Sequence, residues 1–343
     1  MTPLFQYELL NQPFGDPVLF VRLTGEKKAL LFDLGDISFL KAGKLFKVSH
    51  VFVSHTHIDH FIGFDYLVRL NLARDKTICI YGPEGIIRNI KGKLKGYTWN
   101  LVDDYPFVLE VVEICAKKLR RVHFICKDRF KPGQVETAPF EGAIDVNPHY
   151  TVKALRVDHK IASIAYSLEE RFHININKDR LQGLELPVGK WLRQLKDYIW
   201  EGKPDSWLVR IPEDNANEKI HKEIPLGELK KEIVTITSGQ KIVYISDCRG
   251  IEKNFRKIIP FASGADILFC EAAFLEKDSE KARKRGHLTA RQAGFIAREA
   301  GVRELQVIHF SPRYEHCPEL LYLEAEKEFM ANPAKAVKSS LEL

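Results

Sequence analysis

The chain contains no uninterrupted run of about 18 or more apolar residues, so no membrane-spanning helix is expected. Its first residues, MTPLFQ, lack the basic stretch followed by an apolar stretch that marks a secretory signal peptide. The six cysteines include no closely spaced pair, which disfavours both a zinc ribbon and a disulfide framework. We find no internal repeat and no low-complexity segment. These absences predict a globular cytoplasmic protein with reduced thiols.

Neither sign of charge is in strong excess, because the formal net charge is +6 for 343 residues. Such a balance does not by itself indicate a nucleic-acid-binding protein. Basic residues nevertheless gather at residues 86–97, which hold no acid, and at residues 117–131, which hold a single one. Either stretch could lie along a phosphate backbone or form a solvated face. The length and a hydrophobic content of 45% suit one large domain or two modest ones, and we expect a single domain that spans residues 1–343.

Periodicity predicts strands that alternate with helices. Short apolar runs rich in β-branched residues predict strands at residues 18–23, 29–32, 48–53, 77–81, 108–114, 150–157, 161–168, 241–245, 267–270 and 305–308. Apolar residues at helical spacing predict helices at residues 65–73, 86–94, 289–300 and 318–329. Thr289 resembles an N-cap and Gly301 a stop signal of the third of these helices. This alternation favours an α/β fold in which helices cover sheets, an αββα sandwich.

Between about residues 169 and 238, polar and charged residues dominate. A Pro187-Val188-Gly189 turn lies in this region. An apolar stripe at helical spacing follows it, formed by Trp191, Leu192, Leu195 and Tyr198. We therefore predict a small inserted helical arm at residues 170–205, and this arm is a candidate for substrate binding.

A cluster of metal-ligand side chains follows the strand predicted at residues 48–53. The segment Ser54-His55-Thr56-His57-Ile58-Asp59-His60 crowds three imidazoles and one carboxylate together. Because side chains alternate along an extended chain, His55 and His57 point the same way, and a turn after them directs Asp59 and His60 toward a second point. Imidazole nitrogens suit zinc, and the thiolates of an iron–sulfur site are missing. One loop can therefore serve two metal ions.

This HxHxDH motif resembles that of the metallo-β-lactamase superfamily, and further segments resemble the motifs of its tRNase Z family. Residues 30–36 (LLFDLGD) are similar to the strand and aspartate that precede the metal loop, and residues 81–85 (YGPEG) to a GPxG turn. Residues 308–314 (IHFSPRY) match the HFSxRY motif nearly intact. The other matches are residues 157–159 (VDH), 245–249 (ISDCR), 270–274 (CEAAF) and 286–289 (GHLT). The resemblance spans residues 28–315.

The resemblance implies a metallo-β-lactamase fold and two zinc ions per subunit. One ion would be held by His55, His57 and His159, the other by Asp59, His60 and His309, with Asp247 shared and Asp33 supporting the ligands from behind. A water between two such ions loses a proton near neutral pH and attacks phosphorus in line. Asp59 would take that proton, and His287, oriented by Glu271, would donate one to the departing oxygen.

The resemblance also bears on the substrate and on partners. Residues 174–204 are similar to the arm with which tRNase Z proteins grip tRNA, which implies an endoribonuclease that processes the 3′ ends of precursor tRNA and is a candidate homodimer. Three features depart from the family pattern. Residues 169–205 hold seven basic and seven acidic residues, residues 11–17 replace a GTGSA-type opening, and the HEAT and SGDT segments are altered.

Two other functions stay open from the sequence. The same metals could hydrolyse a small phosphodiester, an ester or a lactone, in which case an enclosed apolar pocket is expected beside them. A positive stripe that leads from the metals across residues 88–95 or 117–131 would favour RNA instead. The chain could also be a non-catalytic RNA-binding relative, although all seven ligand candidates are present.

Overall fold

The computed structural model describes residues 3–214 and 217–331, which form two compact units. The larger unit takes in residues 5–144 and 152–168 and the described residues from 241 onward. The smaller unit takes in residues 3–4 and 145–151 and the described part of residues 169–240. None of the helices within the described ranges has the length and apolar character that a membrane crossing requires.

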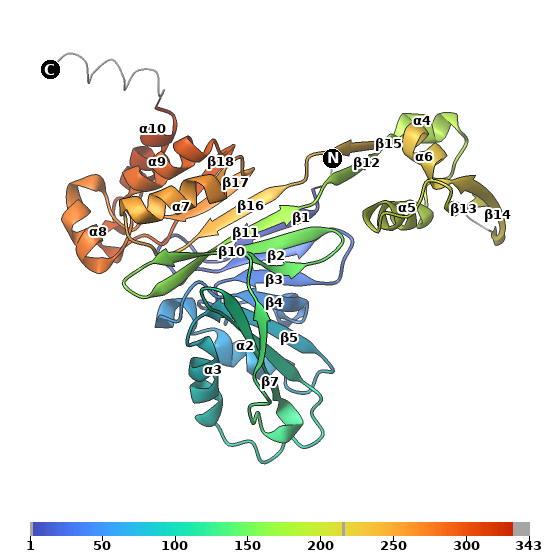
Figure 1. Ribbon diagram of the computed structural model, residues 1–343. Helices are drawn as coiled ribbons and strands as arrows, with labels where there is room; N and C mark the ends of the chain where they lie inside the picture. The colour runs from blue at the N-terminus through green and yellow to red at the C-terminus, as the bar shows by residue number, and fades with distance from the viewer. Residues whose placement is uncertain (1–2, 215–216, 332–343) are drawn as a thin grey trace. The chain divides into compact units, whose positions relative to one another are not determined.

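The first sheet of the larger unit has eight strands in the order in which they follow along the chain (Figure 1). They are β1 (Phe5–Leu9), β2 (Leu19–Leu23), β3 (Ala29–Phe32), β4 (Val48–Phe52), β5 (Thr77–Pro83), β6 (Val108–Ile114), β7 (Lys118–Ile125) and β8 (Glu136–Pro139). The helices α1 (Ala42–Leu45), α2 (Phe64–Asn71) and α3 (Ile86–Lys95) belong to this half. Their buried apolar side chains share one core with those of the sheet, since Phe64 and Ile90 pack with Val51 and Ile80.

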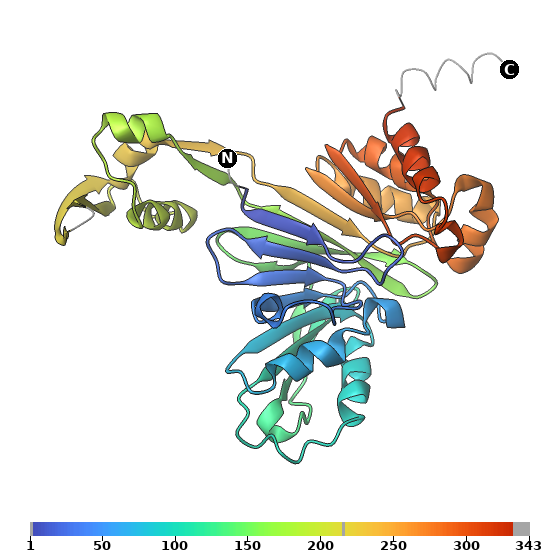
Figure 2. The same cartoon turned by 180° about the vertical axis from the view of Figure 1, so that it is seen from behind.

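The second sheet has six strands in the order β18-β17-β16-β11-β10-β9. Its strands are β9 (Ala143–Val146), β10 (Tyr150–Asp158), β11 (Ala162–Glu170), β16 (Lys241–Ile245), β17 (Ile267–Glu271) and β18 (Glu304–Ile308). The helices of this half are α7 (Glu252–Ala262), α8 (Ser279–Arg285), α9 (Ala290–Ala300) and α10 (Glu319–Phe329), which Figure 2 shows from behind. Residues of α7, α9 and α10, such as Ile258, Ile296 and Leu321, share a core with Val243 and Leu268 of the sheet.

The inner faces of the two sheets contact each other. The rings of Phe32 and Phe52 in the first sheet lie 5.9 and 5.5 Å from that of Tyr166 in the second. The hydroxyl of Tyr166 donates a hydrogen bond of 2.7 Å to the carbonyl of Val53. Helices cover the outer faces, which confirms the predicted αββα sandwich. Strands β3 to β6 and β16 to β18 run parallel within their sheets, so their carboxyl ends meet at common edges, where ligand sites commonly form.

The strands and helices predicted from the sequence are confirmed, with ends that differ by one or two residues. A capping box between Thr289 and Gln292 starts α9, and Gly301, with a φ of 61°, ends it as predicted. Strand β7 was not predicted because it lies in the basic stretch at residues 117–131. Its Arg120 and Arg121 lie 2.8 and 2.9 Å from glutamates of β6, so part of that stretch is neutralised.

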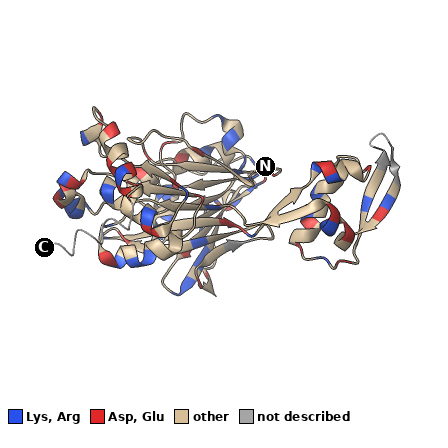
Figure 3. Ribbon diagram, turned by 90° about the horizontal axis from the view of Figure 1, so that it is seen from above, with Lys and Arg blue, Asp and Glu red and all other residues tan. Residues whose placement is uncertain are grey.

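The smaller unit has two strand pairs and three helices. They are β12 (His173–Ile176) with β15 (Val234–Thr237), β13 (Leu208–Asp214) with β14 (Asn217–Pro225), α4 (Lys178–Gly183), α5 (Trp191–Trp200) and α6 (Leu226–Ile233). The unit has its own apolar core, which includes Leu181, Trp191, Leu195, Val209 and Leu229. The arm predicted at residues 170–205 lies inside this unit, which continues to Gln240. Figure 3 shows basic and acidic residues interspersed on it.

Gly63, at the start of α2, packs against the segment that follows β3. A Cβ atom there would lie 2.3 Å from the carbonyl oxygen of Gly35 and 2.9 Å from Cγ1 of Ile37. We expect Gly63→Ala to lower the free energy of unfolding by about 2–3 kcal/mol, measured by urea denaturation, because both neighbours are fixed in the core. Gly43→Ala is the matched control, since its Cβ would meet nothing within 4 Å. An equal loss in both variants would contradict this account.

Candidate metal centre

The first group of candidate ligands gathers at the ends of three strands. His55 and His57 follow β4, His159 follows β10, and Asp247 follows β16. One ligand atom from each lies within 4.8 Å of the other three. Asp247 Oδ2 is 3.8 Å from His55 Nε2 and 3.5 Å from His159 Nε2, and His55 Nε2 is 2.9 Å from His57 Nδ1. Three imidazoles and one carboxylate at this spacing could hold one zinc ion.

The second group lies on the other side of the same carboxylate. Asp59 and His60 belong to the short 3₁₀ helix η1 (Ile58–His60), and His309 follows β18. Asp59 Oδ2 is 3.4 Å from His60 Nε2 and 3.3 Å from His309 Nε2. Asp247 Oδ1 is 3.5 Å from His60 Nε2 and 2.9 Å from His309 Nδ1. Each oxygen of Asp247 therefore faces one of the two groups.

Several polar atoms that face this centre have no hydrogen bond. His60 Nε2, Asp247 Oδ1 and His309 Nδ1 are buried and have no partner in hydrogen-bond geometry among the described residues, although Asp247 Oδ1 and His309 Nδ1 lie 2.9 Å from each other. An unsatisfied buried polar group costs about 1–3 kcal/mol. Three such atoms in one place indicate that a ligand binds there. Imidazole and carboxylate donors suit zinc. The residues present fit a metal centre.

The protonation states also suit a cation. Burial and the neighbouring His60 lower the pKa of His55 to about 2, so its imidazole is neutral at physiological pH. Burial raises the pKa of Asp247, but His309 and His60 outweigh this effect and hold it well below its ordinary value. Although burial lowers the pKa of His309, Asp247 raises it to about 10. The raised pKa of His309 reflects the negative charge of Asp247 beside it, and a buried carboxylate of this kind also attracts a metal ion.

Asp33 holds part of the centre in place from behind. This fully buried carboxylate accepts hydrogen bonds from the backbone amide of Ser54 (2.6 Å), the Ser54 hydroxyl (2.9 Å), the Tyr244 hydroxyl (2.9 Å) and His60 Nδ1 (2.9 Å). The bond from His60 Nδ1 fixes the ring so that Nε2 faces the centre. Asp33 and His309 both have positive φ, 58° and 60°. Non-glycine residues adopt this conformation at a cost, and such strain is common at functional sites.

Two further predicted site residues lie beside the candidate ligands. His287 Nδ1 donates a hydrogen bond of 2.9 Å to Glu271 Oε2, and the other oxygen of Glu271 accepts one from the backbone amide of Cys248 at 2.6 Å. The ring of His287 lies 5.1 Å from that of His159 and 5.6 Å from that of His309. Although burial lowers the pKa of His287, Glu271 raises it above the ordinary value. The structure thus brings all the predicted site residues to one place.

Asn254 supports the centre and was not predicted from the sequence. This buried residue at the start of α7 joins two loops. Its Nδ2 donates to the carbonyls of Asp158 and Arg249, both at 2.9 Å, and its Oδ1 accepts from the amide of Asp158 at 3.0 Å. These loops carry His159 and Asp247. The sequence gives no signal of this role, because burial is not visible in it and the partner Asp158 is 96 positions away.

Replacing Asn254 should loosen both loops together. We expect Asn254→Ala to lower the free energy of unfolding by about 2–3 kcal/mol, since three backbone groups lose their partner. Zinc affinity, measured by competition with a chelator, should fall by about tenfold. Asn175→Ala is a suitable control, because the Asn175 side chain makes an exposed hydrogen bond of 3.3 Å on β12. Unchanged zinc affinity in Asn254→Ala would contradict the positioning role.

Known proteins similar to this chain include proteins named ribonuclease Z and one named a zinc phosphodiesterase. No family model matches the chain. It is 28% identical over 312 residues to ribonuclease Z of Deinococcus radiodurans, which covers 89% of this chain and 90% of that protein. It is 27% identical to zinc phosphodiesterase ELAC protein 1 of Mus musculus, with 96% of this chain and 90% of that protein covered.

Two solved structures resemble the fold. The metallo-beta-lactamase fold protein YhfI from Bacillus subtilis matches with a TM-score of 0.52 at 17% identity, covering 95% of this chain and 93% of that one. Human tRNase Z, short form, matches with a TM-score of 0.51 at 19% identity, covering 90% and 92%. At these identities, the likeness to the solved structures concerns the fold.

Proposed function

We propose that this chain, which has the metallo-β-lactamase fold and is similar to ribonuclease Z proteins, is a zinc-dependent phosphodiesterase, an endoribonuclease that processes the 3′ ends of precursor tRNA. One observation carries this proposal. Six potential ligands converge on Asp247, whose two oxygens face different groups. Such a pair of adjoining sites is the geometry that two-metal hydrolysis of a phosphodiester requires.

The proposed centre holds two zinc ions. His55, His57 and His159 would hold one, Asp59, His60 and His309 would hold the other, and Asp247 would be shared between them. The relative from Mus musculus is named a zinc phosphodiesterase, which supports the choice of metal. When bound, a pair of zinc ions lowers the pKa of a water toward neutrality and neutralises charge that develops on the phosphate.

Two side chains then move protons. The side chain of Asp59 is 37% exposed, whereas that of Asp247 is 2% exposed, so Asp59 is the carboxylate that can accept a proton from the attacking water. His287 donates a proton to the departing oxygen. Glu271 raises the pKa of His287 against the effect of burial, so the protonated imidazole is favoured, and its bond to Nδ1 leaves Nε2 for the substrate.

A small ester or lactone suits the site less well than RNA does. An apolar pocket of about 510 Å³ is present in the larger unit, lined among others by Ile62, Tyr97 and Trp99. None of the predicted site residues lines it. It is therefore not the enclosed pocket at the metals that a small apolar substrate would need. A non-catalytic role would leave the neutral imidazole of His55 and the unpaired polar atoms of the centre without a chemical purpose.

Other parts of the proposal concern the arm, assembly and location. We assign RNA binding to the arm at residues 170–205 and the rest of the smaller unit. We further propose a homodimer in the cytoplasm. Sedimentation equilibrium over a range of protein concentrations tests the dimer, and a single monomeric species at every concentration would contradict it.

The function is tested with purified protein on two substrates. Metal analysis should give two zinc ions per chain. The protein should release the trailer from a 3′-extended tRNA and hydrolyse bis(p-nitrophenyl) phosphate, and chelation of zinc should stop both reactions. Zinc-loaded protein that cuts neither substrate would contradict the proposal. Hydrolysis of the small ester alone would favour the small-substrate alternative, and tRNA binding without cleavage of either would favour the non-catalytic one.

A further inference from the structure

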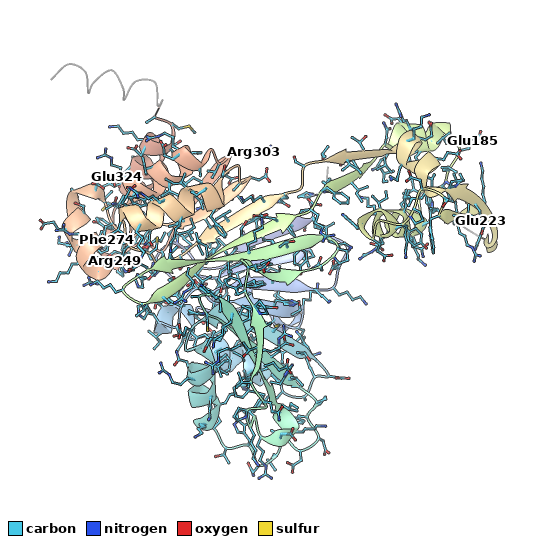
Figure 4. All side chains as sticks on the ribbon, in the orientation of Figure 1. Glu185, Glu223, Arg249, Phe274, Arg303 and Glu324 are labelled. Carbon is cyan, nitrogen blue, oxygen red and sulfur yellow. The ribbon has the colours of Figure 1, made fainter. Side chains whose placement is uncertain are left out.

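A basic hollow near the candidate metal centre has no role in the proposed mechanism. Its volume is about 640 Å³. Lys281, Lys284 and Arg285 of α8 line one part of it, and Ser311, Pro312 and Arg313 line another. Phe274, labelled in Figure 4, completes the lining, and no acidic side chain takes part in it.

Most of the positive charge in this hollow is uncompensated. Lys281 Nζ lies 2.5 Å from Asp278 Oδ1, so that cation is neutralised. Lys284, Arg285 and Arg313 have no carboxylate within 4.0 Å among the residues that the structure describes, although Arg313, after Lys281, helps to lower the pKa of Asp278. Like charges around one hollow repel one another, and an anion placed between them relieves the repulsion. All three side chains are exposed, so an incoming anion can reach them.

The walls of the hollow continue into the candidate centre. Helix α8 ends at Gly286, whose φ of 91° turns the chain, and His287 follows directly. The carbonyl of Gly286 accepts a hydrogen bond of 2.8 Å from His159 Nδ1. The ring of Phe274 lies 6.1 Å from that of His287. Ser311 comes two residues after His309. An anion in the hollow would therefore lie next to the group that is cleaved.

We propose that this hollow binds a backbone phosphate that neighbours the cleaved one. Guanidinium and ammonium groups bind phosphate oxygens through charge-assisted hydrogen bonds. Successive phosphates of one strand are only about 3.4 Å apart along a helix axis, so a site beside the centre meets the next phosphate. An RNA strand has such a phosphate, whereas a single phosphodiester, an ester or a lactone has none. The inference rests on the proposed function. It adds a binding site for a second phosphate, which only a polynucleotide substrate would supply.

The test removes Lys284 and Arg285, the two cations of α8 that line the hollow and form no ion pair within the described part of the chain. In Lys284→Gln/Arg285→Gln, KM for a 3′-extended tRNA should rise about tenfold with little change in kcat, because the flanking contact is equally strong before and during cleavage. Binding is measured separately by fluorescence anisotropy in a His287→Ala background, where tRNA is consumed slowly. The slope of log Kd against log salt concentration should fall by about one for each lost cation.

The control is Lys277→Gln/Arg283→Gln, which removes two exposed cations close by in the sequence that do not line the hollow. It should keep the KM and salt slope of the wild type. Bis(p-nitrophenyl) phosphate has no neighbouring phosphate, so the α8 variant should hydrolyse it within about twofold of the wild-type rate. An unchanged KM and salt slope in the α8 variant, or an equal loss in the control, overturns the proposal. If the wild type fails to cut tRNA but the α8 variant binds it more weakly, the proposed function falls and the hollow is supported.

Discussion

Asp247→Ala should lower cleavage of both 3′-extended tRNA and bis(p-nitrophenyl) phosphate by about 10³-fold or more, a loss of about 4 kcal/mol in transition-state stabilisation. The reason is geometric. Asp247 Oδ2 faces His55 and His159, and Asp247 Oδ1 faces His60 and His309, so one substitution removes a ligand from both proposed sites. Steady-state rates and zinc content per chain, which should fall well below two, measure the effect.

Two companion variants separate lost chemistry from lost folding. Asp247→Asn keeps the volume of the side chain but removes its charge and one acceptor oxygen, so it should lose activity nearly as fully as Asp247→Ala. Asp103→Ala removes an exposed aspartate, whose side chain is 66% exposed, and should leave both rates unchanged. Circular dichroism should show all three variants folded. Two zinc ions per chain and wild-type hydrolysis in Asp247→Ala would refute the shared-ligand assignment.

The part of the site that lies on one continuous segment could be predicted from the residues alone. His55, His57, Asp59 and His60 follow a strand within a few positions, and the alternation of side chains is enough to split them into two directions. His159, Asp247 and His309 have no such local signal, because each comes from a different strand end far along the chain. Only the resemblance of their surrounding motifs to a known family selected them.

Two of the supporting residues, Tyr244 and Asn254, could not be predicted because their partners are set by tertiary contacts. The hydroxyl of Tyr244 reaches Asp33 across 211 positions, from one sheet to the other. In the sequence, Tyr244 is one more apolar residue of a strand. The sequence likewise gives no indication of the role of Asn254, because that role depends on a loop 96 positions earlier. Buried polar residues of this kind are hydrogen-bonded, but composition does not name the partner.

The fold was predictable wherever apolar periodicity was strong. Strand β3 is a run of four buried residues, and the capping box of α9 marks its own start. The sequence was misleading where charged residues obscured the apolar pattern of a strand. This happened in β7, whose arginines form ion pairs with glutamates of β6. The predicted arm ends at residue 205, because the strands that complete the smaller unit lie later in the sequence and have no helical pattern. Strand β12 pairs with β15, so the unit is complete only when the chain has passed Val234–Thr237.

Removing most of the smaller unit should abolish cleavage of tRNA and spare hydrolysis of bis(p-nitrophenyl) phosphate. The cut follows from the register of β12 and β15, in which His173 is paired with Thr237. Replacing residues 174–236 by an Asn-Gly turn joins two chain ends that already face each other. The buried residues that form the apolar core of the smaller unit all lie in the excised segment. Neither of the two large cores of the larger unit contains a residue of that segment. The remaining unit should therefore fold.

The expected loss for tRNA is about 10²-fold or more in kcat/KM, with hydrolysis of the small ester within about twofold of the wild type. Residues 169–240 hold 12 basic and 13 acidic residues, so the proposed binding of RNA by this unit would depend on particular contacts rather than on net charge. Removal of the unit should therefore change the salt slope little. Leu195→Asp, which disrupts the core of the unit but keeps the chain length, should have a similar effect. Full tRNA cleavage by the deletion variant would exclude the smaller unit from substrate binding. Loss of both activities would mean instead that the unit is needed for the metal centre itself.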